Sequence, residues 1–189
     1  MVVIAGPSGV GKGTVVAGLR ARFPEILFSV SATTRPPRAG ETDGISYHFV
    51  TDEQFDALVA GDGLLEWAEY AATRYGTPRQ PVLDAMAQGK TMLLEIDLAG
   101  ARQIRSSFPE AFQVFIAPPS WDELERRLRG RGAETEAQMA ARLARAKDEL
   151  AAESEFDAVI VNDDVELAID QLVELLGLSG RAPDSKGNL

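Results

Sequence analysis

Short apolar runs alternate with longer segments of helical periodicity over most of the chain. The apolar runs predict buried strands, and apolar positions three and four apart predict helices. The predicted strands cover residues 2–5, 27–31, 47–50, 64–69, 92–96, 114–117 and 159–161. The predicted helices cover residues 12–23, 81–88, 100–107, 120–129, 135–154 and 165–176, with a further short helix after Thr51. This alternation predicts an α/β fold whose parallel sheet carries helices on both faces.

Residues 32–75 interrupt this alternation. Residues 32–44 are polar and rich in Pro and Gly, which predicts a long loop, and Gly61-Asp62-Gly63 predicts a turn. We therefore expect a small insert with strands of its own. Helix starts are marked by Ser or Thr followed three residues later by Glu or Gln, and these pairs predict capping boxes at Thr51 with Gln54, Ser120 with Glu123, and Thr135 with Gln138.

The composition is that of a soluble globular protein forming one domain. The chain has 189 residues, of which 45% are hydrophobic and 25% are charged. No apolar run approaches the roughly 18 residues of a membrane span. A net charge of −10 argues against general binding to nucleic acid, which needs a basic face. Cysteine is absent, which excludes disulfides and thiol nucleophiles and fits a reducing cytoplasm.

The segment GPSGVGKGT lies between the first predicted strand and the first predicted helix. A glycine-rich turn in this position directs backbone N–H groups, the helix dipole and a lysine toward one point, which is typical of nucleotide phosphate binding. The alternative is a glycine-rich connection without a ligand. Lys12 is predicted to reach the β- and γ-phosphates. The predicted ATP-binding residues of the loop are Gly6, Pro7, Ser8, Gly9, Val10, Gly11, Lys12, Gly13 and Thr14.

The end of this loop departs from the usual pattern. Gly13 stands where a hydroxyl normally helps to hold Mg²⁺, and Thr14 follows one place later. The GKGT ending also resembles the phosphate loop of adenylate kinases, so we interpret it as a variant. The direct protein ligand of Mg²⁺ is left open, and we expect the ion to be held by phosphates and water.

Two arginines in the segment from Ser29 to Phe49 suggest a second phosphate site. Arg35 and Arg38 are separated by two prolines, which stiffen the chain and limit how far the guanidiniums can spread. Paired, pre-organised guanidiniums suit a terminal phosphate, and Tyr47 could add a hydroxyl. A solvated polar loop is the alternative for this stretch alone.

Glu66 is a candidate for recognition of a base. Guanine presents N1–H and its 2-amino group on one edge, and a single carboxylate can accept both hydrogen bonds. Adenine has an acceptor at N1 and cannot satisfy a carboxylate in that way. Discrimination becomes steep when the wrong base leaves a buried polar group unpaired. Taken alone, Glu66 is more simply a strand residue that faces solvent.

Spacing distinguishes two arginines in the arginine-rich stretch from Trp121 to Glu149. Ordinary pairs four residues apart are expected for Arg126 with Asp122, Arg127 with Glu123 and Arg129 with Glu125. Arg131 lies between two glycines, and Arg142 has no acid three or four residues away on either side. We expect these two to stabilise charge in a phosphoryl transfer. The single histidine, His48, is interpreted as structural.

The segment SATTRPPRAGETDGISYHF is similar to the GMP-binding segment of guanylate kinases. The chain resembles that family in order over about residues 2–176, including LLEWAEY at 64–70, RYGT at 74–77, LLEIDLAGA at 93–101, RLRGRG at 127–132 and VIVNDD at 159–164. Arg74 departs from the pattern, because the family often has an aromatic residue there.

The resemblance assigns roles to individual residues. It implies that the GMP phosphate is bound by Arg35, Arg38, Tyr47 and Tyr75, with Glu41 in the same site. It implies that guanine is bound by Ser31, Glu66, Thr77 and Asp97. Arg131 and Arg142 match lid arginines, and Asn162 is expected near the adenine of ATP. The predicted catalytic residues are Lys12, Arg38, Arg131 and Arg142.

The resemblance also implies an architecture, a P-loop NTPase-type parallel sheet with helices on both faces. The expected core covers residues 1–31, 80–119 and 151–178, a GMP-binding insert covers residues 32–79, a lid covers residues 120–150, and the tail 179–189 is expected to fray. Insert and lid are expected to close on the substrates.

The activity implied by the resemblance is transfer of the γ-phosphoryl group of MgATP to GMP, and also to dGMP, in purine nucleotide metabolism. One alternative is a guanylate-kinase-like module that binds phosphopeptides without catalysis, against which Lys12 and the intact glycine loop argue. Another is a related nucleoside or sugar-phosphate kinase, against which Glu66 and the Arg35–Arg38 segment argue. ATP and GMP are the expected partners, with no nucleic acid and no membrane.

Overall fold

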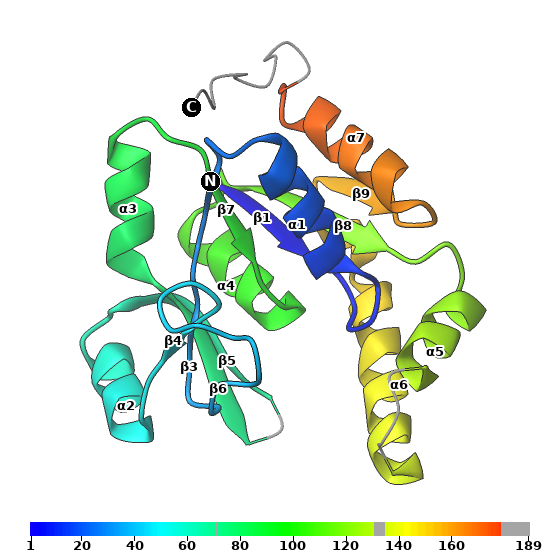
Figure 1. Ribbon diagram of the computed structural model, residues 1–189, viewed down its shortest axis with the longest axis horizontal. Helices are drawn as coiled ribbons and strands as arrows, with labels where there is room; N and C mark the ends of the chain where they lie inside the picture. Colours follow the sequence, from blue (N-terminus) through cyan, green and yellow to red (C-terminus); the bar gives the residue numbers. More distant parts are fainter. Residues whose placement is uncertain (71, 131–134, 179–189) are drawn as a thin grey trace. The chain divides into compact units, whose positions relative to one another are not determined.

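The computed structural model describes residues 1–70, 72–130 and 135–178 (Figure 1). The chain divides into two compact units, and the boundary falls within strand β1 (Val2–Ala5). The first unit comprises Met1–Ile4 and Ile26–Gln113, and the second comprises Ala5–Glu25 and the chain from Val114 onward. Each unit carries part of the predicted site.

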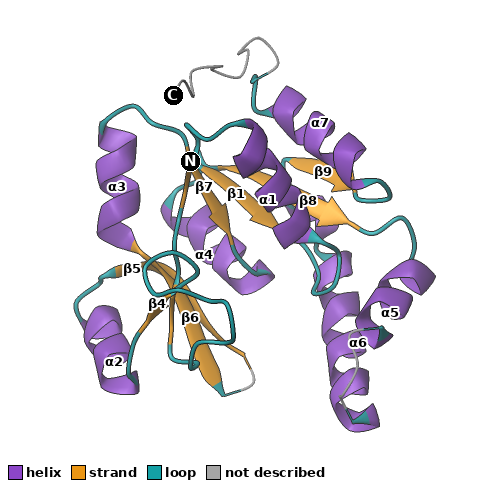
Figure 2. Ribbon diagram, viewed as in Figure 1, coloured by secondary structure: helices purple, strands orange, loops and turns teal. Residues whose placement is uncertain are grey.

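The first unit contains parallel strands with helices, as the alternating pattern predicts. Strands β1, β7 (Met92–Glu95) and β2 (Leu27–Phe28) pair in parallel in the order β2-β7-β1, with Val2 opposite Leu93. The middle of β1 and of β7 is fully buried, which explains the continuous apolar sequence of these two strands. Helices α3 (Arg79–Ala87) and α4 (Leu98–Ser107) belong to the same unit. Figure 2 draws both in purple.

A second sheet of the first unit is formed by the predicted insert. Its order is β4-β3-β6-β5, from β3 (Ala32–Thr33), β4 (His48–Phe49), β5 (Leu64–Tyr70) and β6 (Thr73–Pro78). Helix α2 (Asp52–Ala60) begins at Thr51 with both halves of the predicted capping box. Phe55 of α2 packs with Ala32 and Leu64 in a small apolar core.

Two expectations for the insert were wrong. The predicted loop 32–44 begins with strand β3, and β6 was not predicted at all. Both are strands because of their partners: β6 pairs antiparallel with β5 on one side and with β3 on the other. Pairing can impose the strand conformation where the local sequence does not favour it. The strand predicted for residues 27–31 is shorter in the structure and ends at Phe28.

The second unit begins with helix α1 (Lys12–Arg22), which packs against helix α7 (Val165–Leu175) (Figure 2). Gly18 permits this approach, because a Cβ at that position would collide with the side chain of Ile169. Strands β8 (Phe112–Ala117) and β9 (Ala158–Val161) pair in parallel. The remaining elements are α5 (Trp121–Arg129), α6 (Glu136–Ala151) and the 3₁₀ turn η1 (Glu153–Glu155).

The helix starts of the second unit follow the prediction only in part. Thr135 and Gln138 form the predicted capping box of α6. Ser120 accepts a hydrogen bond from the Glu123 backbone at the start of α5, but this box is only half formed. The Glu123 carboxylate binds Arg126 and Arg127 instead, since charged hydrogen bonds are the stronger ones. Helix α6 also ends at Ala151, before the predicted residue 154.

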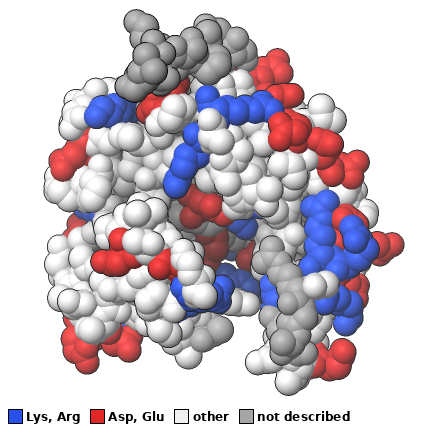
Figure 3. Space-filling view, viewed as in Figure 1, with Lys and Arg blue, Asp and Glu red and all other residues white. Residues whose placement is uncertain are grey.

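Charged side chains cover helix α5. Lys and Arg gather over this helix with acidic side chains beside them (Figure 3), and the residues concerned include Arg126 and Arg129. Within the described part of the chain, no helix combines the length and the apolar character that a membrane crossing requires.

Candidate functional site

The phosphate loop leads from strand β1 into helix α1 with the backbone geometry that its glycines allow. Gly6 has a φ of 143° and Gly11, which caps α1, has a φ of 97°. Both values lie in the region that favours glycine. A Cβ on Gly6 would collide with the Ile116 backbone, and one on Gly11 would lie 2.5 Å from Nδ2 of Asn162. The loop can therefore follow this path only with glycine at both positions.

Lys12 folds back over this loop. Its Nζ donates hydrogen bonds to the carbonyl oxygens of Gly6 and, at 3.2 Å, Pro7. Gly13 and Thr14 are exposed in the first turn of α1, which contains no acidic residue. The first turn of α1 thus places no carboxylate of its own at the N-terminal end of the helix dipole, which suits a phosphate ligand.

The residues near the loop do not form a protein cage for a metal ion. Among the described residues, no three His, Cys, Asp or Glu side chains are grouped so that they could hold a metal. Gly13 has no side-chain oxygen to offer. Mg²⁺ typically keeps several waters and binds together with substrate phosphates.

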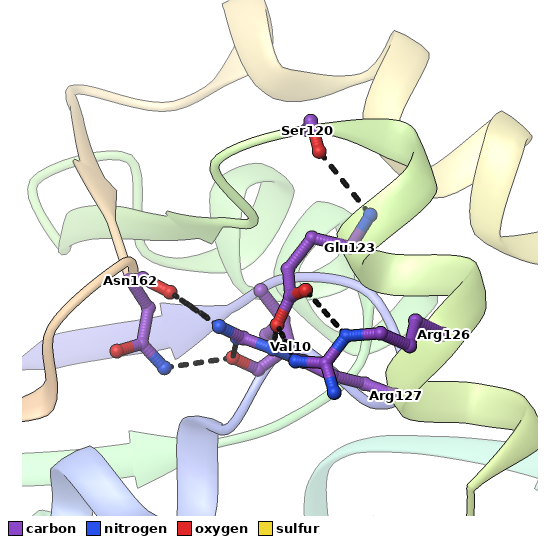
Figure 4. Close-up of polar contacts among 6 residues, drawn as sticks. All are labelled: Val10, Ser120, Glu123, Arg126, Arg127 and Asn162. Atoms are coloured by element: carbon purple, nitrogen blue, oxygen red, sulfur yellow. Dashed lines mark hydrogen bonds and ion pairs between the residues drawn. The ribbon is translucent and has the colours of Figure 1, made fainter.

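Asn162 anchors the residue at the centre of the loop. It is 2% exposed, and its Nδ2 donates a 2.7 Å hydrogen bond to the carbonyl of Val10 (Figure 4). Arg127 of α5 joins the two residues from the other side, because its Nη1 donates to the carbonyls of both Val10 and Asn162. Arg127 also forms the predicted pair with Glu123. The interpretation of Arg127 as an ordinary surface pair was therefore incomplete.

The Glu123 carboxylate binds two arginines of α5. Hydrogen bonds from Arg126 and then Arg127 lower the pKa of Glu123 to about 2 (Figure 4). The predicted pair of Arg126 with Asp122 was wrong, because Arg126 binds Glu123 three residues away. The pair of Arg129 with Glu125 is confirmed. These contacts order the face of α5 that holds Arg127 against the loop.

Helix α6 contacts the phosphate loop at Ser8. Nη2 of Arg142 donates to the Ser8 hydroxyl at 3.1 Å, and the Ser8 N–H donates to Oε2 of Glu149 at 3.2 Å. Glu149 is only 6% exposed, and its other oxygen accepts from Nε of Arg145. The structure thus places the predicted Arg142 on the loop. The predicted Arg131 lies outside the described residues.

The predicted phosphate-binding residues of the first unit form one cluster. Arg35 is 9% exposed and binds both carboxylate oxygens of Glu41 at 2.7 Å. Its guanidinium also lies over the Tyr47 ring, 5.0 Å from the centroid, and the rings of Tyr47 and Tyr75 meet edge to face. The Arg38 backbone N–H donates to the same carboxylate. The cluster around Arg35 therefore includes three other side chains and one backbone group.

The contacts within this cluster keep Glu41 and Arg35 charged. The hydrogen bonds from Arg35 and from the Arg38 backbone lower the pKa of Glu41 to about 2, and the same pair raises the pKa of Arg35 above its usual value. Burial raises the pKa of Tyr47. The Arg38 side chain itself is exposed. The cluster keeps one buried cation and one carboxylate at every pH at which the protein is expected to work.

The predicted guanine-binding residues form a second cluster in the same unit. Glu66 is 5% exposed, and its Oε1 accepts a 2.6 Å hydrogen bond from the Thr77 hydroxyl, which is also buried. Burial raises the pKa of Glu66 to about 7, and the charge of Asp97 adds to this shift. Asp97 caps α4 by accepting from the Gly100 N–H. The interpretation of Glu66 as a solvent-facing strand residue was thus wrong.

Two other predicted residues have mainly backbone roles in the described contacts. Ser31 is half-buried, and its carbonyl accepts from the N–H of His48. His48 lies in strand β4, which fits the structural role expected for it.

Arg74, the departure from the family pattern, has a clear structural role. Its guanidinium pairs with Asp52 and Asp56 of α2 and lies 4.8 Å from the centroid of the Phe55 ring. Its own strand, β6, also carries Tyr75 and Thr77. Arg74 therefore holds α2 to the strand that supplies two predicted GMP residues.

The sequence analysis did not identify the contacts of Arg127 and Glu149 with the loop, although the sequence contains a signal for Glu149. The buried positions of α6 are Met139, Ala146 and Glu149, spaced seven and three apart on one face of the helix. An acidic residue on an apolar face is rarely left without a buried partner. Arg127 gave no such signal, because Glu123 already explained its charge.

The chain is similar to known proteins over most of its length. The family model described as guanylate kinase matches residues 1–178. A guanylate kinase of Synechococcus sp. (strain CC9902) is 62% identical over 172 residues, which is 91% of this chain and 92% of that protein. One of Thermobifida fusca (strain YX) is 59% identical over 176 residues, covering 93% of this chain and 90% of that protein.

Solved structures show the same relationship. The crystal structure of guanylate kinase from Anaplasma phagocytophilum matches with a TM-score of 0.76 and 33% identity, covering 95% of this chain and 85% of that one. A shikimate kinase from Bacteroides thetaiotaomicron, at a TM-score of 0.53 and 18% identity over 94% of this chain and 98% of that one, shares the fold alone. The fold is that of a P-loop α/β protein, and the chain belongs to the guanylate kinase family.

Proposed function

We propose that the chain transfers the γ-phosphoryl group of ATP to GMP and produces ADP and GDP. The observation that carries this proposal is Glu66, a buried carboxylate whose Oε1 accepts from Thr77. The Arg35 cluster lies in the same unit and suits a 5′-phosphate. A base site and a phosphate site together define a nucleoside monophosphate.

Guanine fits the first of these sites better than adenine does. A carboxylate accepts from N1–H and from the 2-amino group of guanine, and Asp97 adds a further acceptor near the same edge. Adenine would place its own N1 acceptor against a carboxylate. Because Glu66 is buried, the mismatch would leave both groups without partners, and such mismatches are strongly rejected.

ATP belongs at the phosphate loop of the second unit. The loop N–H groups and Lys12 hold the phosphates. Asn162 is fixed on Val10 through Nδ2, and its buried Oδ1 has no hydrogen-bond partner among the described residues. That oxygen is an acceptor suited to the 6-amino group of adenine. Mg²⁺ held by the phosphates and water neutralises charge on the phosphate oxygens.

The transfer needs position and fixed charge more than acid–base chemistry. An oxygen of the GMP phosphate attacks the γ-phosphorus, and the bond to the β-phosphate oxygen of ADP breaks. Charge spreads over the equatorial oxygens, where Lys12, Arg38 and Arg142 stabilise it, together with Arg131. No group with a pKa near neutrality is required to accept a proton.

In the predicted division into a core, an insert at 32–79 and a lid at 120–150, the insert and the lid are expected to close over the bound substrates. Closure of insert and lid would exclude water, which would otherwise hydrolyse ATP. Small-angle scattering with and without both nucleotides tests it. Equal dimensions in the two samples would contradict closure.

ADP release from MgATP tests the activity, with GMP, AMP, CMP, UMP or no acceptor. We expect rapid release only with GMP and, more slowly or equally, dGMP. Binding of GMP without turnover by any acceptor would contradict the proposal and favour a binding module. Operation in the cytoplasm stays a prediction of the sequence.

A further inference from the structure

One face of helix α4 contacts the strand that carries Glu66. Asp97, Gly100 and Gln103 are spaced three residues apart from the start of the helix, so they lie along the same side. Asp97 is already among the predicted guanine-binding residues.

Gln103 holds the backbone of strand β5 at the residue after Glu66. Its Oε1 accepts from the Trp67 N–H at 3.1 Å, and its Nε2 donates to the Trp67 carbonyl at 2.7 Å. A side-chain amide that satisfies both groups of one residue replaces a neighbouring strand at this point of the sheet edge. The position of β5 relative to α4 is thus fixed beside Glu66.

Gly100 leaves the space that the Glu66 carboxylate fills. A Cβ at this position would lie well inside van der Waals distance of Oε2 and 3.0 Å from Cδ. The other oxygen, Oε1, is held by Thr77. The carboxylate is therefore confined between a hydroxyl on one side and a bare helix backbone on the other.

We propose that Gly100 and Gln103 are specificity-determining positioning residues, which place the Glu66 carboxylate to accept from the guanine edge. This inference rests on the proposed function. Gly100 acts by lacking a side chain, and Gln103 acts by fixing the strand. Neither residue has to touch the nucleotide, because both act through the oxygen atoms of Glu66.

Gly100→Ala is the sharpest test. The added methyl group meets the ends of two side chains, that of Glu66 and, at 3.3 Å, that of Ile96, and alanine favours the helix, so the variant is expected to fold. Its Cβ must displace Oε2. We expect KM for GMP to rise about tenfold, as for a weakened hydrogen bond to a charged group, with KM for ATP unchanged. Ala99→Gly, at the exposed neighbouring position, is the control for helix stability.

Inosine monophosphate supplies a readout that a general loss of stability would not change. It lacks the 2-amino group and so loses one of the two hydrogen bonds to the carboxylate. The preference for GMP over IMP in kcat/KM should fall severalfold in Gly100→Ala and in Gln103→Met, which keeps the volume of Gln103 without its hydrogen bonds. Ala99→Gly should keep the wild-type preference.

A double-mutant cycle separates action through Glu66 from any other effect. In a Glu66→Ala background, Gly100→Ala should cause no further loss in kcat/KM for GMP, because no carboxylate remains to be displaced. Independent losses that multiply would contradict the proposal, as would a wild-type KM and GMP preference in Gly100→Ala. If the wild-type protein turned over no GMP, the proposed function would fail instead, and GMP titration of the same variants would still test the placement of Glu66.

Discussion

The phosphate loop of the second unit and the Arg35 cluster of the first hold their cations in different ways. Lys12 rests on the neutral carbonyls of Gly6 and Pro7, within its own loop. Arg35 is bound by the carboxylate of Glu41 and stacks on Tyr47. The contacts of Lys12 within its loop thus involve neutral carbonyl oxygens, whereas Arg35 forms an ion pair with a carboxylate before any ligand binds.

We therefore expect Lys12 and Arg35 to have different roles, one in catalysis and the other in binding. A lysine in the phosphate loop can stabilise charge that develops during phosphoryl transfer, so its loss should reduce kcat. An arginine that is already paired offers a fixed geometry more than a net charge, so its replacement should affect binding. The predictions below test this division, beginning with the largest expected effect.

Lys12→Ala should lower kcat by about 10³-fold, because it removes a cation from the transferring phosphate. GMP binding should be unchanged, since the GMP residues belong to the other unit. Steady-state rates and GMP titration measure the two effects. Lys90→Ala, at an exposed lysine, should behave as wild type. A loss confined to KM for GMP would refute the division of roles.

Glu66→Gln should lower kcat/KM for GMP by about 10²-fold, because an amide cannot accept both guanine hydrogens without offering a donor of its own. The same change should stabilise the nucleotide-free protein at pH 8 by about 3 kcal/mol at most, since the pKa of Glu66 is raised from 4.5 to about 7. Thermal unfolding measures this. An unchanged GMP preference would contradict the role of Glu66.

The sign of the pH dependence follows from the same shift. The folded protein holds the Glu66 proton more firmly than the unfolded chain, so its contribution to stability is complete below about pH 4.5 and is lost as pH rises to about 7. GMP needs the ionised carboxylate, so KM for GMP should fall as pH rises through 7. Thr77 and Asp97 are the groups that face Glu66.

Glu66→Gln is the control for this profile, because the GMP phosphate titrates in the same range. The part of the pH dependence that belongs to Glu66 should vanish in the variant. The Arg35 cluster should add nothing, since the pKa of Glu41 is about 2. An identical profile in wild type and Glu66→Gln would assign the pH dependence to the substrate alone.

Arg35→Lys should raise KM for GMP about tenfold with a smaller effect on kcat. Lysine keeps the charge but loses the planar fork that binds both oxygens of Glu41. Initial rates at varied GMP measure the change. Should kcat fall as far as in Lys12→Ala, the paired arginine would have to act on the transferring group as well.

The sequence predicted the phosphate loop more completely than the Arg35 cluster, because only the loop is contiguous in the chain. The phosphate loop is contiguous, and its glycines and lysine act on their own neighbours, so the motif alone identified Lys12. The strands buried on both faces, such as β1 and β7, were equally clear. Strand β6 was missed because TRYGTP has no apolar periodicity and becomes a strand only between β3 and β5.

The residues of the first unit's site come from separate strands and become neighbours only in the folded chain. Spacing suggested Arg35, but Glu41, Tyr75 and Thr77 followed only from the family resemblance. Gln103 was not found, because its partners are backbone groups of Trp67, and no sequence pattern reports a contact of that kind. The sequence left two interpretations of Glu66 open, a candidate for base recognition and a strand residue that faces solvent, and its burial excludes the second.

Arg74→Leu should have the smallest effect. The arginine lies in the same insert as Arg35 and is likewise paired with acids, but Asp52 and Asp56 are mostly exposed, so water and salt weaken these pairs. Leucine keeps an apolar contact with Phe55. We expect the melting temperature to fall by about a few degrees, with kcat and KM within about twofold of wild type because nothing near Glu66 or Arg35 is removed. Thermal unfolding and initial rates measure both. A tenfold rise in KM for GMP would show that the position of α2 controls the site. The ion pairs of Arg74 would then contribute to GMP binding, as the ion pair of Arg35 is expected to do.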